Sequence, residues 1–284
     1  MKILVTDATG FIGNHLIPIL LERGHTIIAT GRNQTKAFAA DWYNHVRFII
    51  FDISLLPKEE SLFDFFDNPD VLIHLAWDGL SDLNDLIHVE KYLYSHYQFL
   101  KTYIYSGGKH ILVTGTCLEY GIQKGCLDEE MPVDPITSYG IAKNSLRQFL
   151  NVLQQSQFQF IFQWVRLFYM FGKGQSPRSI IPQLEDAIQK GDAIFNMSGG
   201  EQLRDYLSVT KVSEYIARIA EQEDVVGTIN CSSGKPIAIK TLVKEFAESF
   251  DSDIQFNYGY YPYKDYEPMA FWGSDKKLKK IIYE

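Results

Sequence analysis

The sequence predicts an α/β protein built around a doubly wound parallel sheet, followed by a smaller C-terminal domain. Short β-rich runs alternate with helical stretches in the first half of the chain, as expected if crossover helices connect parallel strands. The expected strands are almost continuously apolar, which indicates burial on both faces. A composition of 46% hydrophobic and 22% charged residues is typical of a packed globular protein.

The individual elements follow from the period of the apolar residues. Residues 1–168 are expected to form the sheet domain, to which residues 205–232 return. Residues 169–284 are expected to form the smaller domain, because after residue 168 Gly and Pro interrupt the regular alternation of strands and helices. We expect strands at Lys2–Thr6, Thr26–Thr30, Val46–Phe51, Val71–Ala76, His110–Thr114, Phe160–Phe168 and Gly227–Cys231. We expect helices at Phe11–Glu22, Asn84–Tyr105, Tyr139–Gln155, Val212–Glu223 and Ile239–Phe250.

Charge, hydropathy and cysteine usage exclude several classes of protein. The net charge of −8 comes without basic blocks, so nucleic acid is not expected as a partner. No run reaches the roughly 18 apolar residues of a membrane span, and the amino terminus does not resemble a secretory signal. Cys117, Cys126 and Cys231 lack the spacing of a zinc site. We therefore expect a cytoplasmic protein without a metal.

A glycine-containing turn joins the first expected strand to the first helix. Thr6–Gly13 reads TDATGFIG, and in such a turn backbone N–H groups at a helix N-terminus can bind a pyrophosphate. Thr6, Gly10, Phe11, Ile12 and Gly13 are the candidate cofactor-binding residues; a purely structural turn is the alternative. Asp7 occupies a position where Gly is usual, which Asp can tolerate because it adopts positive φ more readily than most residues.

Arg32 follows the second expected strand, where no acidic residue is available to bind a ribose 2′-hydroxyl. A planar guanidinium suits a 2′-phosphate. NADP(H) is therefore favoured and NAD remains possible; the alternative is a solvated Arg at the start of a loop.

Tyr139 and Lys143 are spaced i,i+4 at the start of an expected helix and so share one face. A phenol with a pKa near ~10 needs stabilisation of its anion to act near neutral pH. We expect the Lys143 ammonium, together with a bound cofactor, to lower the pKa of Tyr139. In isolation this spacing is also compatible with an exposed helix pair.

The sequence Val113–Gly121, VTGTCLEYG, lies at the end of the strand that precedes Tyr139 and Lys143 and helps to interpret their spacing. With the glycine turn, it resembles the SSxxxYG and TGxxGxxG motifs of the extended short-chain dehydrogenase/reductase family, which has a Rossmann fold. The resemblance implies that Thr116 is the catalytic Ser/Thr, acting with Tyr139 and Lys143. It also implies that Asp52 and Ile53 contact adenine, and that Leu75 and Ala76, in a HLAW sequence similar to the family's HLAA, lie beside the cofactor.

Two later segments resemble the nucleotide-sugar epimerase/dehydratase/reductase branch of that family. VRLFYMFG at 165–172 is similar to RxFNxYG, and LRDYLSV at 203–209 to RDFxxV. The resemblance implies that Arg204 contacts the diphosphate of a nucleotide sugar; pairing with an acid such as Asp205 is the alternative. The candidate substrate-binding residues are Thr116, Cys117, Tyr169, Arg178 and Arg204.

The function expected from this resemblance is NADPH-dependent reduction of the C4 ketone of a nucleotide-activated 4-keto-6-deoxysugar. One alternative is an NAD-dependent nucleotide-sugar 4-epimerase, and another is a non-catalytic NADP-binding sensor. The expected helices Asn84–Tyr105 and Tyr139–Gln155 could form a four-helix interface, so the resemblance also implies a homodimer.

Overall fold

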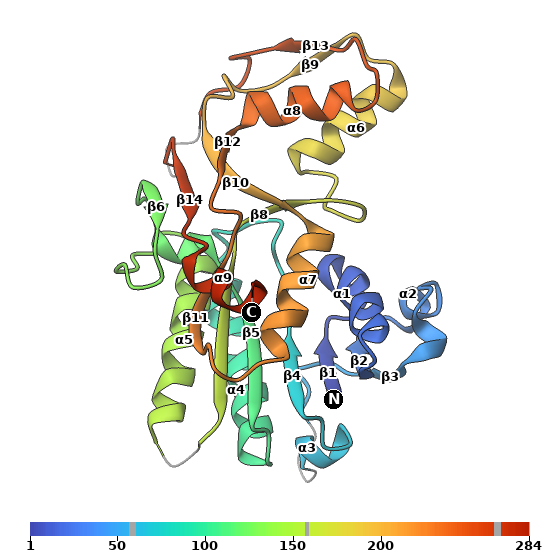
Figure 1. Cartoon of the computed structure of the whole chain (residues 1–284), viewed down its shortest axis with the longest axis vertical. Helices are drawn as coiled ribbons and strands as arrows, with labels where there is room; N and C mark the ends of the chain where they lie inside the picture. The colour runs from blue at the N-terminus through green and yellow to red at the C-terminus, as the bar shows by residue number, and fades with distance from the viewer. Residues whose placement is uncertain (57–60, 157–158, 264–267, 284) are drawn as a thin grey trace.

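The computed structural model describes residues 1–56, 61–156, 159–263 and 268–283. Its largest feature is a parallel seven-stranded sheet with the order β11-β7-β5-β4-β1-β2-β3 (Figure 1). The order reverses between β1 and β4, the switch point at which doubly wound sheets bind ligands. The predicted fold class is confirmed. The strands are β1 Lys2–Thr6, β2 Thr26–Gly31, β3 Arg47–Ile50, β4 Val71–His74, β5 His110–Thr116, β7 Ile161–Leu167 and β11 Gly227–Cys231.

Helices cover both faces of this sheet. One apolar cluster joins the sheet to α1, α7 and α9, and another joins it to α3, α4 and α5. The C-terminal helix α9 packs on α7 and β11, beside the large sheet, although the sequence assigned it to the smaller domain. The helices are α1 Phe11–Glu22, α3 Leu62–Phe65, α4 Leu93–Tyr105, α5 Ser138–Gln155, α7 Val209–Ala220 and α9 Lys276–Ile282; α2 Gln34–Phe38 and the 3-10 turns η1 Tyr43–His45 and η3 Cys117–Tyr120 lie in connections.

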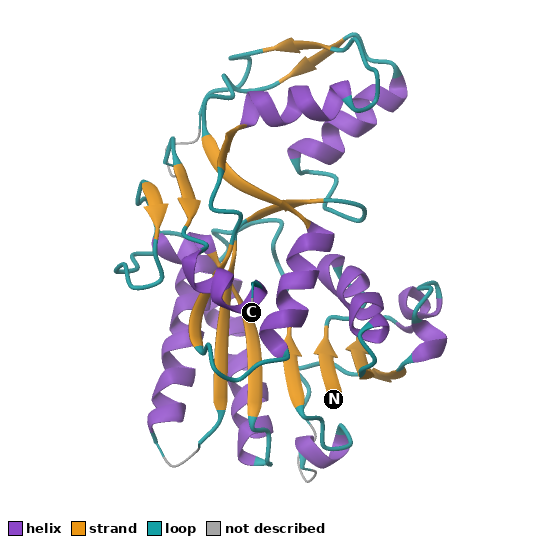
Figure 2. Ribbon diagram, viewed as in Figure 1, coloured by secondary structure: helices purple, strands orange, loops and turns teal. Residues whose placement is uncertain are grey.

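Short strands and two helices form the region above the carboxyl ends of the sheet (Figure 2). β10 pairs with β8 and β12, and β9 pairs with β13, while α6 and α8 share a separate apolar cluster. Of the stretch 205–232, β11 joins the large sheet but β10 does not. The elements are β6 Gly125–Leu127, β8 Tyr169–Phe171, β9 Ile194–Asn196, β10 Leu203–Ser208, β12 Pro236–Ala238, β13 Gln255–Asn257, β14 Phe271–Gly273, α6 Ile180–Lys190 and α8 Ile239–Glu248.

Three element boundaries differ from the predicted ones, two of them because of side-chain hydrogen bonds. β4 ends at His74 because the N–H groups of Leu75 and Ala76 donate to Thr6 Oγ1 rather than to a strand. α7 begins at Val209, three residues early, because the Ser208 hydroxyl caps its first turn. The helix expected from residue 84 begins instead with the π-helical turn η2, His88–Tyr92.

The starts of two helices line one cavity at the carboxyl end of the sheet. α1 starts directly after β1, and α5 starts after Thr137, whose hydroxyl accepts a hydrogen bond from Gly140 N at 3.0 Å. Tyr139 N donates to Leu83 O at 2.9 Å, which ties the start of α5 to the loop before η2. The first turn of α5 is thus held over the carboxyl ends of β4 and β5.

Candidate active site

The β1–α1 turn has the geometry of a phosphate-binding loop. Asp7 adopts φ 53°, as expected for one of the residues that tolerate this region. A Cβ at Gly10 would collide with the Asp7 carboxylate, and one at Gly13 with the Asp7 carbonyl. α1 has no side-chain cap, so its first N–H groups are available to a pyrophosphate. The loop therefore fits a dinucleotide.

The Asp7 carboxylate lies within this loop, next to Gly10. Burial and the nearby Asp78 raise the pKa of Asp7 to about 6, against the opposing effects of Arg32 and Lys36. Above pH 6 the loop therefore carries a negative charge at the place where a pyrophosphate would bind.

The other predicted cofactor residues lie around the carboxyl ends of β1, β2 and β4. Thr6, Arg32, Asp52, Ile53 and Ala76 line one small cavity. Arg32 Nη2 pairs with Asp78 Oδ1 at 2.5 Å, and Asp52 accepts two hydrogen bonds from Ser54. The guanidinium that favoured a 2′-phosphate is therefore already engaged with a carboxylate.

The three predicted catalytic residues come together at the ends of β5 and α5. Lys143 Nζ donates to Thr114 O at 2.8 Å and lies 4.2 Å from the centre of the Trp77 ring. Tyr139 is 9% exposed, and it lines one cavity of about 480 Å³ together with Thr116 and the loop residues Phe11 and Ile12. The Tyr139 phenol, the Thr116 hydroxyl and the phosphate-binding loop therefore line a single cavity.

In the protein without a cofactor, burial sets the protonation of Tyr139 and Lys143. Desolvation, with smaller effects of Glu119 and Cys117, raises the pKa of Tyr139 above its ordinary value despite the opposing effect of Thr116. Desolvation also lowers the pKa of Lys143 to about 7. The ammonium by itself does not acidify the phenol, which stays protonated and can act as a proton donor.

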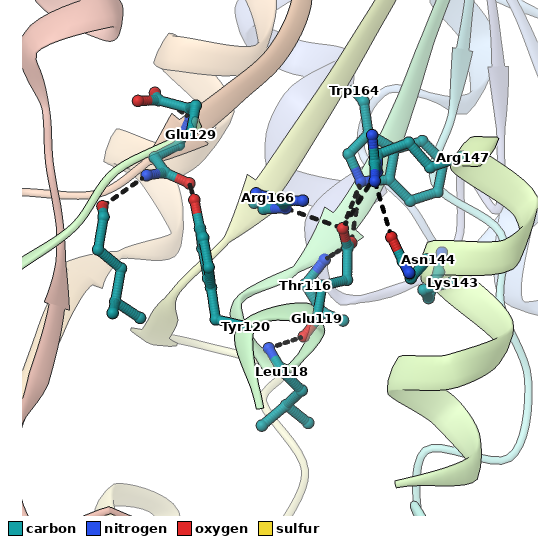
Figure 3. A network of polar contacts seen from close by, with 12 residues as sticks. Thr116, Leu118, Glu119, Tyr120, Glu129, Lys143, Asn144, Arg147, Trp164 and Arg166 are labelled. Carbon is teal, nitrogen blue, oxygen red and sulfur yellow. Dashed lines mark hydrogen bonds and ion pairs between the residues drawn. The ribbon is translucent and has the colours of Figure 1, made fainter. Parts of the chain in front are cut away.

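A buried carboxylate, Glu119, holds Thr116 in place (Figure 3). It accepts hydrogen bonds from Thr116 N at 2.9 Å and from Arg166 Nε at 2.8 Å. The indole N–H of Trp164 also donates to the Glu119 carboxylate, and Arg147 Nε lies 3.8 Å from Glu119 Oε2. The sequence reasoning missed Glu119, although Thr116 and Glu119 have the spacing of a capping box.

The predicted substrate residues fall in two cavities that Tyr169 lines in common. Cys117 lines the cavity of Tyr139, whereas Arg178 and Arg204 line a second one of about 410 Å³ with Tyr206. Arg204 is buried, lies 4.5 Å from the centre of the Phe271 ring and donates to Leu203 O. The second cavity also includes Tyr261 and Tyr263, to which the sequence reasoning gave no binding role.

Asp205 has a separate, structural role. Its carboxylate accepts hydrogen bonds from Ser233 N at 2.7 Å and Gly234 N at 3.0 Å. These bonds fix the loop between β11 and β12.

Comparison with known proteins shows the family of this chain. The model of the NAD dependent epimerase/dehydratase family matches residues 3–232, and the chain belongs to that family. It is 32% identical over 275 residues to dTDP-6-deoxy-L-talose 4-dehydrogenase (NAD(+)) of Aggregatibacter actinomycetemcomitans, covering 96% of this chain and 100% of the relative. It is 23% identical to CDP-abequose synthase of Yersinia pseudotuberculosis, covering 99% and 98% of the two chains.

Solved structures share the fold. UDP-glucose-4-epimerase from Stenotrophomonas maltophila, with bound NAD and formylated UDP-arabinopyranose, gives a TM-score of 0.87 at 17% identity, covering 100% of this chain and 92% of that one. UDP-N-acetylglucosamine 4-epimerase from Methanobrevibacter ruminantium gives 0.84 at 22%, with coverage of 100% and 92%. The chain is an enzyme of the oxidoreductase or epimerase type that depends on a nicotinamide dinucleotide, as the sequence predicted.

Among the described residues, no helix combines the length and apolarity needed to cross a membrane. Nor does that part of the chain contain a group of three or more His, Cys, Asp or Glu side chains that could hold a metal ion.

Replacing Asp7 with Asn should strengthen binding of NAD⁺ at pH 7.5 by about tenfold, equivalent to ~1.4 kcal/mol, because it removes the negative charge from the loop. Asp7 binds a proton as the pH falls through about 6, so the two proteins should converge at pH 5. Calorimetric titration at both pH values tests this. Asp251→Asn, at another positive φ, is the control; equal affinities of wild type and Asp7→Asn at pH 7.5 would contradict the prediction.

Replacing Glu119 with Gln should lower the free energy of unfolding by about 3 kcal/mol, because it leaves the buried Arg166 without its anion. Urea denaturation measures the change. Glu214→Gln, which breaks an exposed pair with Lys211 on α7, should cost under ~1 kcal/mol. Similar losses in both variants would show that Glu119 has no special structural role.

Proposed function

We propose that this enzyme interconverts the C4 ketone and C4 hydroxyl of a nucleotide-activated 6-deoxysugar, with reduction of the ketone as the forward direction. The observation that carries the proposal is the cavity shared by Thr116, Tyr139 and the phosphate-binding loop. Tyr169 connects it with the cavity of Arg178 and Arg204, whose cations suit a diphosphate. The names of relatives that act on dTDP-, GDP- and CDP-sugars support this substrate class.

The chemistry assigns a role to each side chain. A nicotinamide dinucleotide, when bound, supplies the hydride. Thr116 and Tyr139 bind the C4 oxygen, and the protonated Tyr139 phenol donates its proton to that oxygen as the carbonyl is reduced. Lys143, with one N–H on Thr114 O, would use the others to hold the nicotinamide ribose. The buried site excludes water from the reacting atoms.

We further propose NAD(H) as the cofactor in place of NADP(H). The basis for NADP(H) was an available Arg32, but this guanidinium is paired with Asp78. A 2′-phosphate would have to compete with that carboxylate and would lie near Asp7 and Asp52, which line the same cavity. The name of the 32% identical relative, which includes NAD(+), supports the same choice.

Replacing Tyr139 with Phe should lower kcat at least a hundredfold without changing the Kd for NADH, because only the proton donor is lost. Oxidation of NADH and NADPH is followed with dTDP-, UDP-, GDP- and CDP-4-keto-6-deoxyhexoses. Tyr103→Phe, another buried Tyr on α4, should keep wild-type kcat.

Three outcomes would reject parts of this proposal. A protein that carries bound NAD⁺ and interconverts 4-epimers without added NADH is an epimerase. One that binds NADH but turns over none of these sugars, with or without Tyr139, is a sensor. A higher kcat/KM with NADPH than with NADH would restore the original cofactor expectation.

We also propose that the chain forms a homodimer through α4 and α5. These helices pack on each other, with the Tyr97 and Phe149 rings 5.4 Å apart. Their outer faces expose Tyr94, Phe149 and Val152, which are 65%, 43% and 64% exposed. Exposed apolar side chains on two neighbouring helices are typical of an interaction surface.

Replacing Val152 with Glu should convert the dimer to a monomer at micromolar concentration, because it places a charge in this apolar surface. Light scattering after size-exclusion chromatography measures the mass. Ile194→Glu, at a position on β9 that is 59% exposed, should stay dimeric. A monomeric wild-type protein would contradict the proposal.

A further inference from the structure

A buried row of polar side chains runs from the end of β1 to α4. Thr6 Oγ1 lies 3.0 Å from His74 Nδ1, and His74 Nε2 lies 2.8 Å from His96 Nδ1. All three residues are at most 1% exposed. Burial lowers the pKa of His74 to about 3 and that of His96 well below its ordinary value. Both imidazoles are therefore neutral, and each carries a single proton.

The direction of these hydrogen bonds follows from the donors around Thr6. Its oxygen accepts from Leu75 N at 3.1 Å and from Ala76 N at 3.2 Å, so both lone pairs are occupied and the hydroxyl must donate to His74 Nδ1. His74 then carries its proton on Nε2 and donates it to His96 Nδ1. If His74 Nδ1 donated to Thr6 instead, the Thr6 oxygen would have to accept three hydrogen bonds, from His74 and from the N–H groups of Leu75 and Ala76. His96 therefore carries its proton on Nε2.

Packing fixes where the His96 ring lies. It stacks on Trp77 with the ring centres 4.3 Å apart and the planes at 17°. Trp77 is held in turn by its indole N–H, which donates to His88 Nδ1 at 3.1 Å. Among the described residues, none accepts a hydrogen bond from His96 Nε2. His96 lines the cavity of Thr6, Asp7 and Gly31, and a second cavity of about 300 Å³ beside it.

We propose that His96 is a cofactor-binding residue that donates its Nε2–H to an acceptor oxygen in the ribose–phosphate portion of the dinucleotide. The two cavities lie at the carboxyl ends of β1, β2 and β4, where a doubly wound sheet binds a dinucleotide. The nearby carboxylates of Asp78 and Asp52 are already hydrogen-bonded to Arg32 and Ser54. The inference rests on the proposed dinucleotide site but not on the identity of the sugar.

Binding of ADP-ribose, which has the ribose–phosphate portion without nicotinamide, tests the proposal. His96→Phe keeps a ring on Trp77 but removes the donor, and should raise the Kd for ADP-ribose about tenfold. His110→Phe removes another buried imidazole, at the amino end of β5, and should leave that Kd unchanged. Wild-type affinity in His96→Phe would overturn the proposal.

A second measurement needs only the wild-type protein. In ¹⁵N-histidine NMR spectra, His96 should show the Nε2–H tautomer, and added ADP-ribose should shift its Nε2 resonance. A proton on Nδ1, or a resonance that does not move at saturation, would overturn the proposal even if His96→Phe failed to fold. Tight ADP-ribose binding without reduction of any 4-ketosugar would reject the proposed function and leave this inference intact.

Discussion

The buried ammonium of Lys143 is the constraint on which the site depends. A cation at this depth is costly; the Thr114 carbonyl and the Trp77 ring offset part of that cost, and the pKa of Lys143 still falls to about 7. The Thr114 carbonyl belongs to β5 and Trp77 follows β4. The contacts of the ammonium with them therefore hold the start of α5 against this end of the sheet. Tyr139 lies one helical turn earlier and is positioned by the same contact. Glu119 completes the arrangement by holding the backbone of Thr116.

Desolvation of Tyr139 and Lys143 determines which proton transfers this site can perform. Trp77 lies against His96 and close to Tyr139 and His88, forming an aromatic cluster around the phenol. The resulting desolvation raises the pKa of Tyr139 and lowers that of Lys143. A protonated phenol suits the reduction of a ketone, whereas the oxidative direction needs a further positive charge to stabilise the phenolate, which an oxidised nicotinamide supplies when bound.

Local pattern was enough to predict the sheet, because apolar runs and the helices between them follow directly from burial on both faces. The resemblance of the strand-end and helix-start segments to family motifs predicted a site formed by Thr116, Tyr139 and Lys143. Contacts between distant segments were not predictable: Asp78 is 46 residues from Arg32 and engages it. The boundary of β4 likewise depends on Thr6, 69 residues away, and the neutral row of histidines depends on the same hydroxyl.

Transfer of a labelled hydrogen tests the central claim most directly. The enzyme is incubated with NADH carrying two deuterium atoms at nicotinamide C4, so that either face transfers the label, and with the nucleotide-4-keto-6-deoxysugar that it reduces. The sugar product is analysed by NMR and mass spectrometry. The account predicts one deuterium, bonded to sugar C4, for each NADH consumed. A product without deuterium at C4, or a sugar that changes configuration while the labelled NADH is unconsumed, would contradict it.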